Sequence, residues 1–441
     1  MGRSAVLVVL AALALCLAAQ DQGQKKRGKT VVAESMSKFG MDMYSVMADV
    51  DKTSNIFFSP MSIGTALAMA YAGSRGETAE QMEQVLHLRG KRSRVLRGHR
   101  GLLRYMKRRY QDDVAVKLTN RMYVAGGLRL RSKFQRTIQR IFQAEITRLN
   151  FSRSKKAAAT INKNVKEDTE GQIDSLVEPK MINDLTRLVL VNAIHFKGDW
   201  LMKFDKKRTI EADFHALTGT KKVPTMRARK MFPVGDLYDL DARILQLPYK
   251  GEDVQMMILL PNARDGIYEL ERRLADRALQ DLSWSAEADY NVTVRLPKFK
   301  LEERVNLKLL LQQMGMADLF DEVAANMRGM SGREALYVTD AVHKAAVEVN
   351  EEGTEASAAT ALAFGFRTIR PRPRPFIVDR PFIFAYPGRP GGRDALPGAC
   401  HGPRRVEDGR RWRPLRRVAP PGGAREGSEQ TPCWAAYSGL A

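Results

Sequence analysis

Apolar residues recur at helical spacing through the first third of the chain. Met36, Phe39, Met43 and Met47 lie on one face of a helix with 3.6 residues per turn. Leu67 and Tyr71 continue this pattern, and it resumes at residues 82–86 after a break at two glycines. The pattern predicts that the chain begins with several consecutive helices.

The later part of the chain changes to the patterns of strands. Residues 116–124 alternate, with Val116, Leu118, Met122 and Val124 on one face, while residues 188–196 are apolar on both faces, as in a central strand. Residues 244–261 predict a hairpin, and residues 291–302 predict a strand interrupted at a proline. Helices first and strands later, without regular alternation, indicate a mixed α+β domain.

The N-terminal end resembles a secretory signal. Arg3 precedes an apolar run over residues 5–19 that is too short to span a bilayer and ends in small residues. We therefore expect residues 1–20 to be a signal peptide and the protein to be secreted into the extracellular space. Two sequons, at Asn150 and Asn291, predict glycosylation in an exported chain.

The three cysteines lie outside the body of the chain, so a hydrophobic core must stabilise it without disulfides. They are Cys16, Cys400 and Cys433. The 72 Lys and Arg residues outnumber the 50 Asp and Glu residues, and a net charge of +22 predicts attraction to polyanions. We expect a sulfated glycosaminoglycan rather than a specific nucleic acid, and no membrane span. No nucleophile elbow, zinc motif or phosphate loop occurs, so the sequence does not indicate an enzyme or a metal site.

The stretch GTEASAATALAFGFRTIRPRPRP, residues 353–375, is composed mainly of small residues and then alternates Arg with Pro. One face at period two holds small or apolar side chains, while Glu355 and Ser357 fall on the other, and no proline occurs before Pro371. The residues of the first face are Thr354, Ala356, Ala358, Thr360 and Leu362. Such a segment could become a central strand, or it could be an alanine-rich connection.

Five motifs occur in a fixed order along the chain. They read NIFFSPMSIGTALAMAYAGSRGETAEQM, LVLVNAIHFKGDWLMKF, LQLPYKGEDVQMMILLP, LPKFKLE and VHKAAVEVNEEGTEASAATA. Their sequences and spacings closely resemble the serpin family over residues 32–385. The resemblance implies a monomeric serpin domain over residues 21–385, with about nine helices, three β-sheets and an exposed reactive loop over residues 351–375. It also implies an inhibitor that needs no cofactor, although heparin or heparan sulfate could act as an activator.

In inhibitory serpins, cleavage lets the reactive loop insert into the main sheet and trap the acylated protease. The resemblance places the cleaved bond between Arg367 and Thr368. Four later arginines are each followed by proline, which trypsin-like proteases accept poorly, so the residues favour the same bond. We therefore expect covalent capture of a trypsin-like serine protease. The hinge residues implied are Glu351, Glu352, Gly353, Thr354, Glu355, Ala356, Ser357, Ala358 and Ala359. The alternative is a serpin that does not inhibit, such as a chaperone or ligand carrier.

Other residues take roles from the same resemblance. Ser59, Ser62, Asn192 and His343 match a polar cluster beneath the main sheet, whose hydrogen bonds change when the sheet opens. Trp200 matches the tryptophan where insertion begins. None of these residues is expected to be catalytic.

Residues 89–110 hold ten Lys and Arg residues and no acidic residue. Apolar residues at helical spacing predict an amphipathic helix with a basic face, which resembles the helix of heparin-binding serpins. An ordinary solvated basic face is the alternative. The predicted polyanion-binding residues are Arg94, Arg97, Arg100, Arg104, Lys107, Arg108 and Arg109.

The tail over residues 386–441 departs from the family. It is rich in Arg, Gly and Pro, where serpins have two apolar strands. Codons for Tyr386 onward allow, one base out of register, the apolar sequence that the family leads one to expect. We therefore interpret the tail as the product of a frameshift, and a true tail would argue against inhibition by this form of the chain.

Overall fold

The N-terminal part of the chain is helical, as its periodicity predicts. The computed structural model describes residues 28–109, 114–252, 254–275, 282, 285–332, 336–354 and 373–386 of the 441, and these belong to one compact unit. The described residues contain eight α-helices. They are α1 (Gly28–Val50), α2 (Pro60–Gly73), α3 (Gly76–Val85), α4 (Arg92–Arg109), α5 (Ser132–Thr137), α6 (Ser154–Asp168), α7 (Ile267–Leu274) and α9 (Leu307–Gln313).

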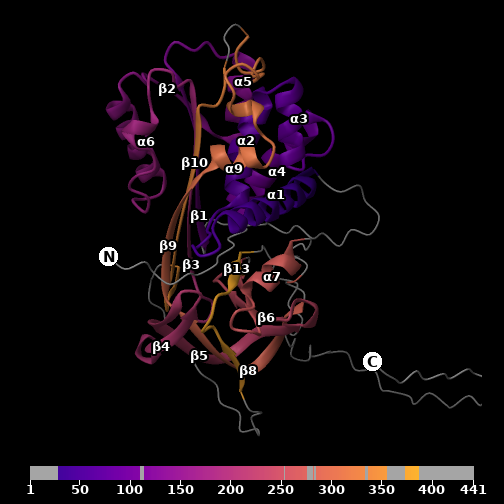
Figure 1. Ribbon diagram of the computed structural model, residues 1–441, viewed down its shortest axis with the longest axis vertical. Helices are drawn as coiled ribbons and strands as arrows, with labels where there is room; N and C mark the ends of the chain where they lie inside the picture. Colours follow the sequence, from indigo (N-terminus) through magenta and orange to yellow (C-terminus); the bar gives the residue numbers. More distant parts are fainter. Residues whose placement is uncertain are drawn as a thin grey trace, which may run out of the picture. The chain divides into compact units, whose positions relative to one another are not determined.

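The first sheet contains the long strands that reach from the helices to the second sheet (Figure 1). Its strands are β1 (Val114–Ala125), β2 (Glu145–Leu149), β3 (Leu188–Asp199), β9 (Phe299–Asn306), β10 (Asp340–Val349) and β11 (Gly353–Thr354). The order is β2-β1-β3-β10-β9, with β11 paired to β3. Because β3 is hydrogen-bonded on both sides and apolar on both faces, it occupies the central position that its sequence predicts.

Helices cover both faces of the first sheet, with α6 on one side and α1, α2 and α9 on the other (Figure 1). Residues of α6 pack with Val189, Val191 and Ala193 of β3 in one apolar cluster. Leu188 and Leu190, which alternate with them, pack in another cluster with residues of α1 and α2. Adjacent residues of β3 therefore bury against opposite layers, as the period of two requires.

The second sheet has the order β12-β8-β5-β6-β7-β13, with β4 paired to β5. Its strands are β4 (Ile210–Ala216), β5 (Gly219–Leu237), β6 (Ala242–Pro248), β7 (Gln255–Pro261), β8 (Glu287–Pro297), β12 (Arg374–Ile377) and β13 (Ile383–Ala385). The hairpin predicted over residues 244–261 is confirmed as β6 and β7. Pro297 ends β8, as the predicted interruption requires.

The described strands form two hydrogen-bonded sheets, where the sequence resemblance implies three. The difference comes from β5, which is 19 residues long and pairs with β4 at its start, with β8 over residues 225–234 and with β6 at its end. One continuous strand thereby joins two groups of strands into a single sheet. The α+β class is confirmed. Among the described residues, no helix is long and apolar enough to cross a membrane.

Candidate functional site

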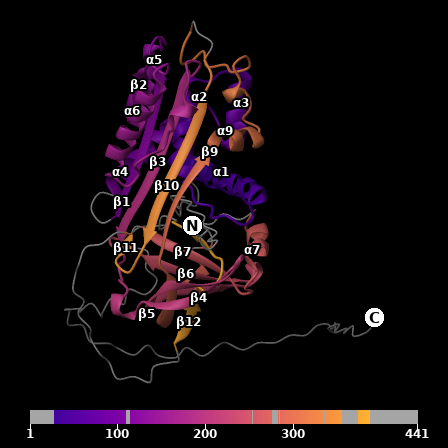
Figure 2. The same ribbon diagram turned by 60° about the vertical axis from the view of Figure 1, so that its left-hand side comes forward.

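The hinge that follows β10 is already paired with the first sheet. After Val349 the chain turns, the N–H of Asn350 donates to the carbonyl of Gly353 at 2.9 Å, and β11 begins. In β11, Gly353 pairs with Asp199 and Thr354 with Gly198, antiparallel to β3. Figure 2 shows β11 at the end of β10, where it starts back along the sheet.

Gly353 is the residue that permits this turn. Its φ is +141°, and a Cβ atom built there would lie 2.1 Å from the carbonyl oxygen of Gly198. A side chain would therefore clash with the backbone of the strand that Gly353 joins.

Trp200 holds the turn against the end of β3. Its side chain is 2% exposed, its indole N–H donates to the carbonyl of Asn350 at 2.9 Å, and its backbone N–H donates to the carbonyl of Glu352 at 2.9 Å. The indole also stacks on Tyr249, with ring centroids 4.4 Å apart. The tryptophan expected at the start of insertion thus directly contacts the hinge.

The two hinge carboxylates are fixed by ion pairs. Glu351 accepts a hydrogen bond from Thr209 at 2.6 Å and pairs with Lys298 at 2.9 Å, while Glu352 pairs with Lys203 at 2.8 Å. Burial raises the pKa of Glu351, but the hydrogen bonds from Thr209 and Lys298 outweigh it and leave the pKa below its ordinary value. The turn is therefore held with both carboxylates charged.

The four residues of the predicted polar cluster come together beneath the first sheet. Ser59 caps α2 and its hydroxyl accepts from the N–H of Ser62 at 3.2 Å. The amide of Asn192 donates to Ser62 Oγ and to Asn120 Oδ1, each at 2.6 Å. The backbone N–H of Ser59 donates to His343 Nε2 at 3.2 Å, and His343 Nδ1 bonds to Asn192 Oδ1.

His343 is neutral in this cluster. Its side chain is fully buried, and burial lowers its pKa to about 3. Since Nε2 accepts from Ser59, the ring proton must lie on Nδ1, which donates to Asn192. His343 and Asn192 are partners in the β10 and β3 register, so separating these strands breaks their bond.

The sequence interpretation missed Asn120, which pairs with Asn192 across β1 and β3. A signal for it was present. Asn120 is the polar member of the row at positions 116, 118, 122 and 124, and a polar residue in a buried row requires a polar partner. It also missed Lys298 and Thr209, because their partner Glu351 lies more than fifty residues further along the chain.

The basic helix predicted at residues 89–110 is confirmed as α4. Val95, Leu102 and Met106 are buried, so the predicted apolar stripe faces the core. The exposed basic residues of α4 are Arg94, Arg97, Arg104, Lys107 and Arg108. Arg100 is half-buried, and the side chain of Arg109 lies outside the described residues.

The remaining predicted sites have mixed outcomes. Asn150 is exposed, and its side chain accepts from Ser152. Asn291 is 8% exposed and accepts from Arg229 Nε at 2.7 Å, which is unfavourable for a glycan acceptor. The side chain of Thr354 lies outside the described residues, as do residues 355–372, which include Glu355, Ala356, Ser357, Ala358, Ala359 and the bond between Arg367 and Thr368. The predicted frameshifted tail also lies outside them, except for the buried Tyr386.

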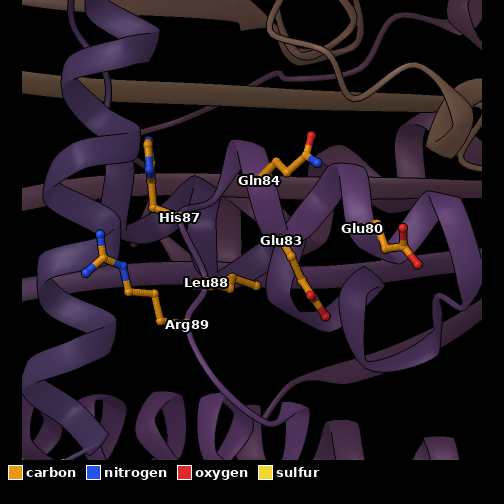
Figure 3. A pocket seen from close by; sticks show the side chains of 6 residues that line it. All are labelled: Glu80, Glu83, Gln84, His87, Leu88 and Arg89. Atoms are coloured by element: carbon orange, nitrogen blue, oxygen red, sulfur yellow. The ribbon is translucent and has the colours of Figure 1, made fainter.

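A surface pocket of about 430 Å³ lies at the end of α3 and is distinct from the hinge. Two lining residues already have partners, since Glu83 accepts from Tyr71 and His87 pairs with Asp42. In Figure 3 the carboxylates of Glu80 and Glu83 point away from His87, so the lining does not converge on one point. In the part of the chain that the structure describes, no group of three or more His, Cys, Asp or Glu residues could hold a metal ion.

Comparison with known proteins identifies the class to which this fold and hinge belong. The family model for serpins, described as serine protease inhibitors, matches residues 34–393. The leukocyte elastase inhibitor of Bos taurus is 37% identical over 374 residues, covering 83% of this chain and 98% of the relative. Serpin B8 of Homo sapiens is 36% identical over 355 residues, covering 80% and 94%. The crystal structure of Serpin48 from Tenebrio molitor has a TM-score of 0.72 at 32% identity, covering 83% and 95%.

The chain belongs to the serpin family. Its α+β fold is the serpin fold. Serpins are protease inhibitors rather than catalysts and need no cofactor, so the chain is not an enzyme.

The expectation of secretion is wrong. The leukocyte elastase inhibitors and Serpin B8 are intracellular serpins, and this similarity points away from export. A short apolar run followed by small residues satisfies the pattern of a signal peptide, but it is weaker information than similarity over most of the chain.

Proposed function

We propose that the protein is a suicide inhibitor of trypsin-like serine proteases, with Arg367 and Thr368 as the reactive bond. The observation that supports this most strongly is the start of β11, where Gly353 and Thr354 pair antiparallel with β3. The segment that follows is free of proline until Pro371 and rich in small residues. It can therefore extend the same ladder.

The register of β11 predicts the partners of an inserted loop. If the pairing continued one residue at a time on insertion, Ala356 would lie opposite Phe196, Ala358 opposite Ile194, and Thr360 opposite Asn192. Phe196 and Ile194 are buried, so the loop residues facing the same layer must be small or apolar. The sequence meets this requirement.

Insertion requires β3 and β10 to separate. Their direct pairing over residues 189–195 of β3 would be replaced by pairing with the loop, and the bond between His343 and Asn192 would be lost. A strand added between them forms two ladders of hydrogen bonds in place of the one that is lost, and this net gain favours the inserted state.

The residue before the reactive bond, Arg367, which we call the bait, supports a trypsin-like target. Several relatives are named for leukocyte elastase, a protease whose class has a small specificity pocket, whereas this chain carries an arginine at the expected bond. The protease serine would add to the Arg367 carbonyl, and the amine of Thr368 would leave. Insertion of the loop would then carry the acyl-enzyme away before water completes hydrolysis.

The proposal is tested by mixing the protein with trypsin. We expect a covalent complex that survives boiling in detergent and has the mass of the protease plus the inhibitor fragment that ends at Arg367, because the fragment from Thr368 onward is no longer bonded. Cleavage without such a complex, and without a rise in melting temperature of the cleaved protein, would identify a serpin that does not inhibit.

The exposed cations of α4 favour binding of a sulfated glycosaminoglycan as a second function. Arg97, Arg104 and Arg108 are exposed at spacings of seven and four residues and so lie along one stripe of the helix. A row of cations binds a polyanion by releasing its counterions, with a strong dependence on salt.

Replacing Arg97, Arg104 and Arg108 by alanine should weaken heparin binding. The slope of log affinity against log salt should fall by about 2 to 3, since each cation contributes roughly 0.7 to 0.9. The matched control removes three exposed cations elsewhere, at Lys133, Arg140 and Arg148. If both variants lose the same slope in a heparin titration, α4 is not a specific site.

A further inference from the structure

Two arginines of the second sheet lie directly opposite each other. Arg227 of β5 pairs with Arg295 of β8 in the antiparallel register, and Arg229 lies two residues further on the same face, opposite Thr293. This face is the outer one, because the alternate residues of β8, Val292 and Val294, are completely buried. The three guanidinium groups thus share one surface.

This arrangement is unfavourable for the folded chain itself. Like charges directly opposite in neighbouring strands destabilise a sheet. Within the described ranges, none of the three arginines forms an ion pair, and the buried Nε of Arg295 has no hydrogen-bond partner. Arg229 donates only to the neutral side chain of Asn291. A buried donor without a partner, next to a like charge on the facing strand, does not stabilise the fold and requires another explanation.

Two nearby arginines form ion pairs, one in β12 and one in the turn between β12 and β13, whereas Arg243 of β6 donates, among the described residues, only to a backbone carbonyl. Arg374 pairs with Asp236, and Arg380 pairs with Asp379 at 2.8 Å. Carboxylates are therefore placed next to some of the arginines in this region. In the described part of the chain no such carboxylate pairs with Arg227, Arg229 or Arg295, so an acidic group on a partner could bind them.

The arginine surface lies beside the C-terminal base of the bait loop. β12 begins at Arg374, at the C-terminal end of the reactive loop, and runs parallel to β8. Pro375 is opposite Thr293, and Ile377 is opposite Arg295. The C-terminal end of the loop at Arg374 therefore lies one strand from Arg295 in β8 and two strands from Arg227 in β5.

We propose that Arg227, Arg229 and Arg295 form a docking surface for an acidic patch on the protease that is captured at the bait. The proposal rests on the proposed function, because it needs a protease at the loop. A polysaccharide is the less favoured partner, because the surface lies next to the strand where the reactive loop ends and a protease bound to the loop would be close to it. Guanidinium groups bind carboxylates in a bidentate manner. Charges at the rim of an interface act mainly on the association rate and its salt dependence.

The test compares two trypsins with the same preference for arginine, one anionic and one cationic. The association rate constant is measured with the full chain, with Arg227→Ala/Arg295→Ala, and with the control Arg140→Ala/Arg148→Ala, which loses the same charge from exposed positions elsewhere. At low salt the unmodified chain should inhibit anionic trypsin about tenfold faster than cationic trypsin. The double variant at residues 227 and 295 should lose most of this preference, and the control should keep it.

The outcomes separate the two proposals. If the unmodified chain inhibits neither trypsin, the proposed function fails and the docking surface fails with it. If it inhibits both, and the 227 and 295 variant keeps the preference and its salt dependence, only the docking surface is overturned. Unchanged rates with a selective loss of heparin binding would also overturn it, because they assign the surface to a polysaccharide.

Folding of the variant is checked by its melting temperature, which should not fall, since the substitution removes a repulsive pair. Should Arg295→Ala fail to fold, Arg227→Gln alone removes one charge and is expected to lose about half of the preference on a logarithmic scale.

Discussion

Replacing Ala356 with arginine should convert inhibition of trypsin into simple cleavage. Extending the register of β11 by two residues would put Ala356 opposite Phe196, which is 2% exposed and whose ring centroid lies 5.1 Å from that of Tyr249. Insertion would bury the guanidinium without a partner, at a cost of several kcal/mol. We expect the fraction of trypsin trapped in the covalent complex, measured on a denaturing gel, to fall at least about tenfold while cleavage continues.

The neighbouring residue provides the control. Glu355 falls on the opposite face of the same strand, so Glu355→Arg should largely preserve the complex. If Ala356→Arg traps trypsin as well as the unmodified protein does, then either the loop does not insert or the register of β11 does not continue into it.

Arg367→Ala should slow the inhibition of trypsin about a thousandfold or more. The acidic specificity pocket of a trypsin-like protease binds the guanidinium, and alanine cannot replace that charge-assisted contact, which corresponds to roughly 4 kcal/mol in the rate. The association rate constant with trypsin measures the effect directly.

Arg370→Ala is the matched control for this prediction, because it removes the next arginine of the loop, which precedes Pro371. Its rate should change less than about twofold. Retention of inhibition by Arg367→Ala would mean that another bond is cleaved, and Arg370 and Phe366 would be the next candidates.

The sequence alone determined most of the elements. Periods of 3.6 and 2 predicted α1, α4, β3 and the β6 and β7 hairpin, because burial of one face leaves a repeat in the chain itself. The motifs with serpin-like spacing predicted the hinge that the structure pairs with β3, while the reactive bond at Arg367 stays a prediction. The signal-like N-terminus misled the interpretation, since a short apolar run is not specific enough to decide export.

Only the tertiary structure decided which polar groups meet. His343 accepts from Ser59 across 284 residues of sequence, and Arg227 faces Arg295 because of the register between β5 and β8. A repeat in the sequence gives the face on which a side chain lies, but not the strand that lies beside it or the residue opposite. Those depend on strand order and register, which the packing of the whole sheet determines.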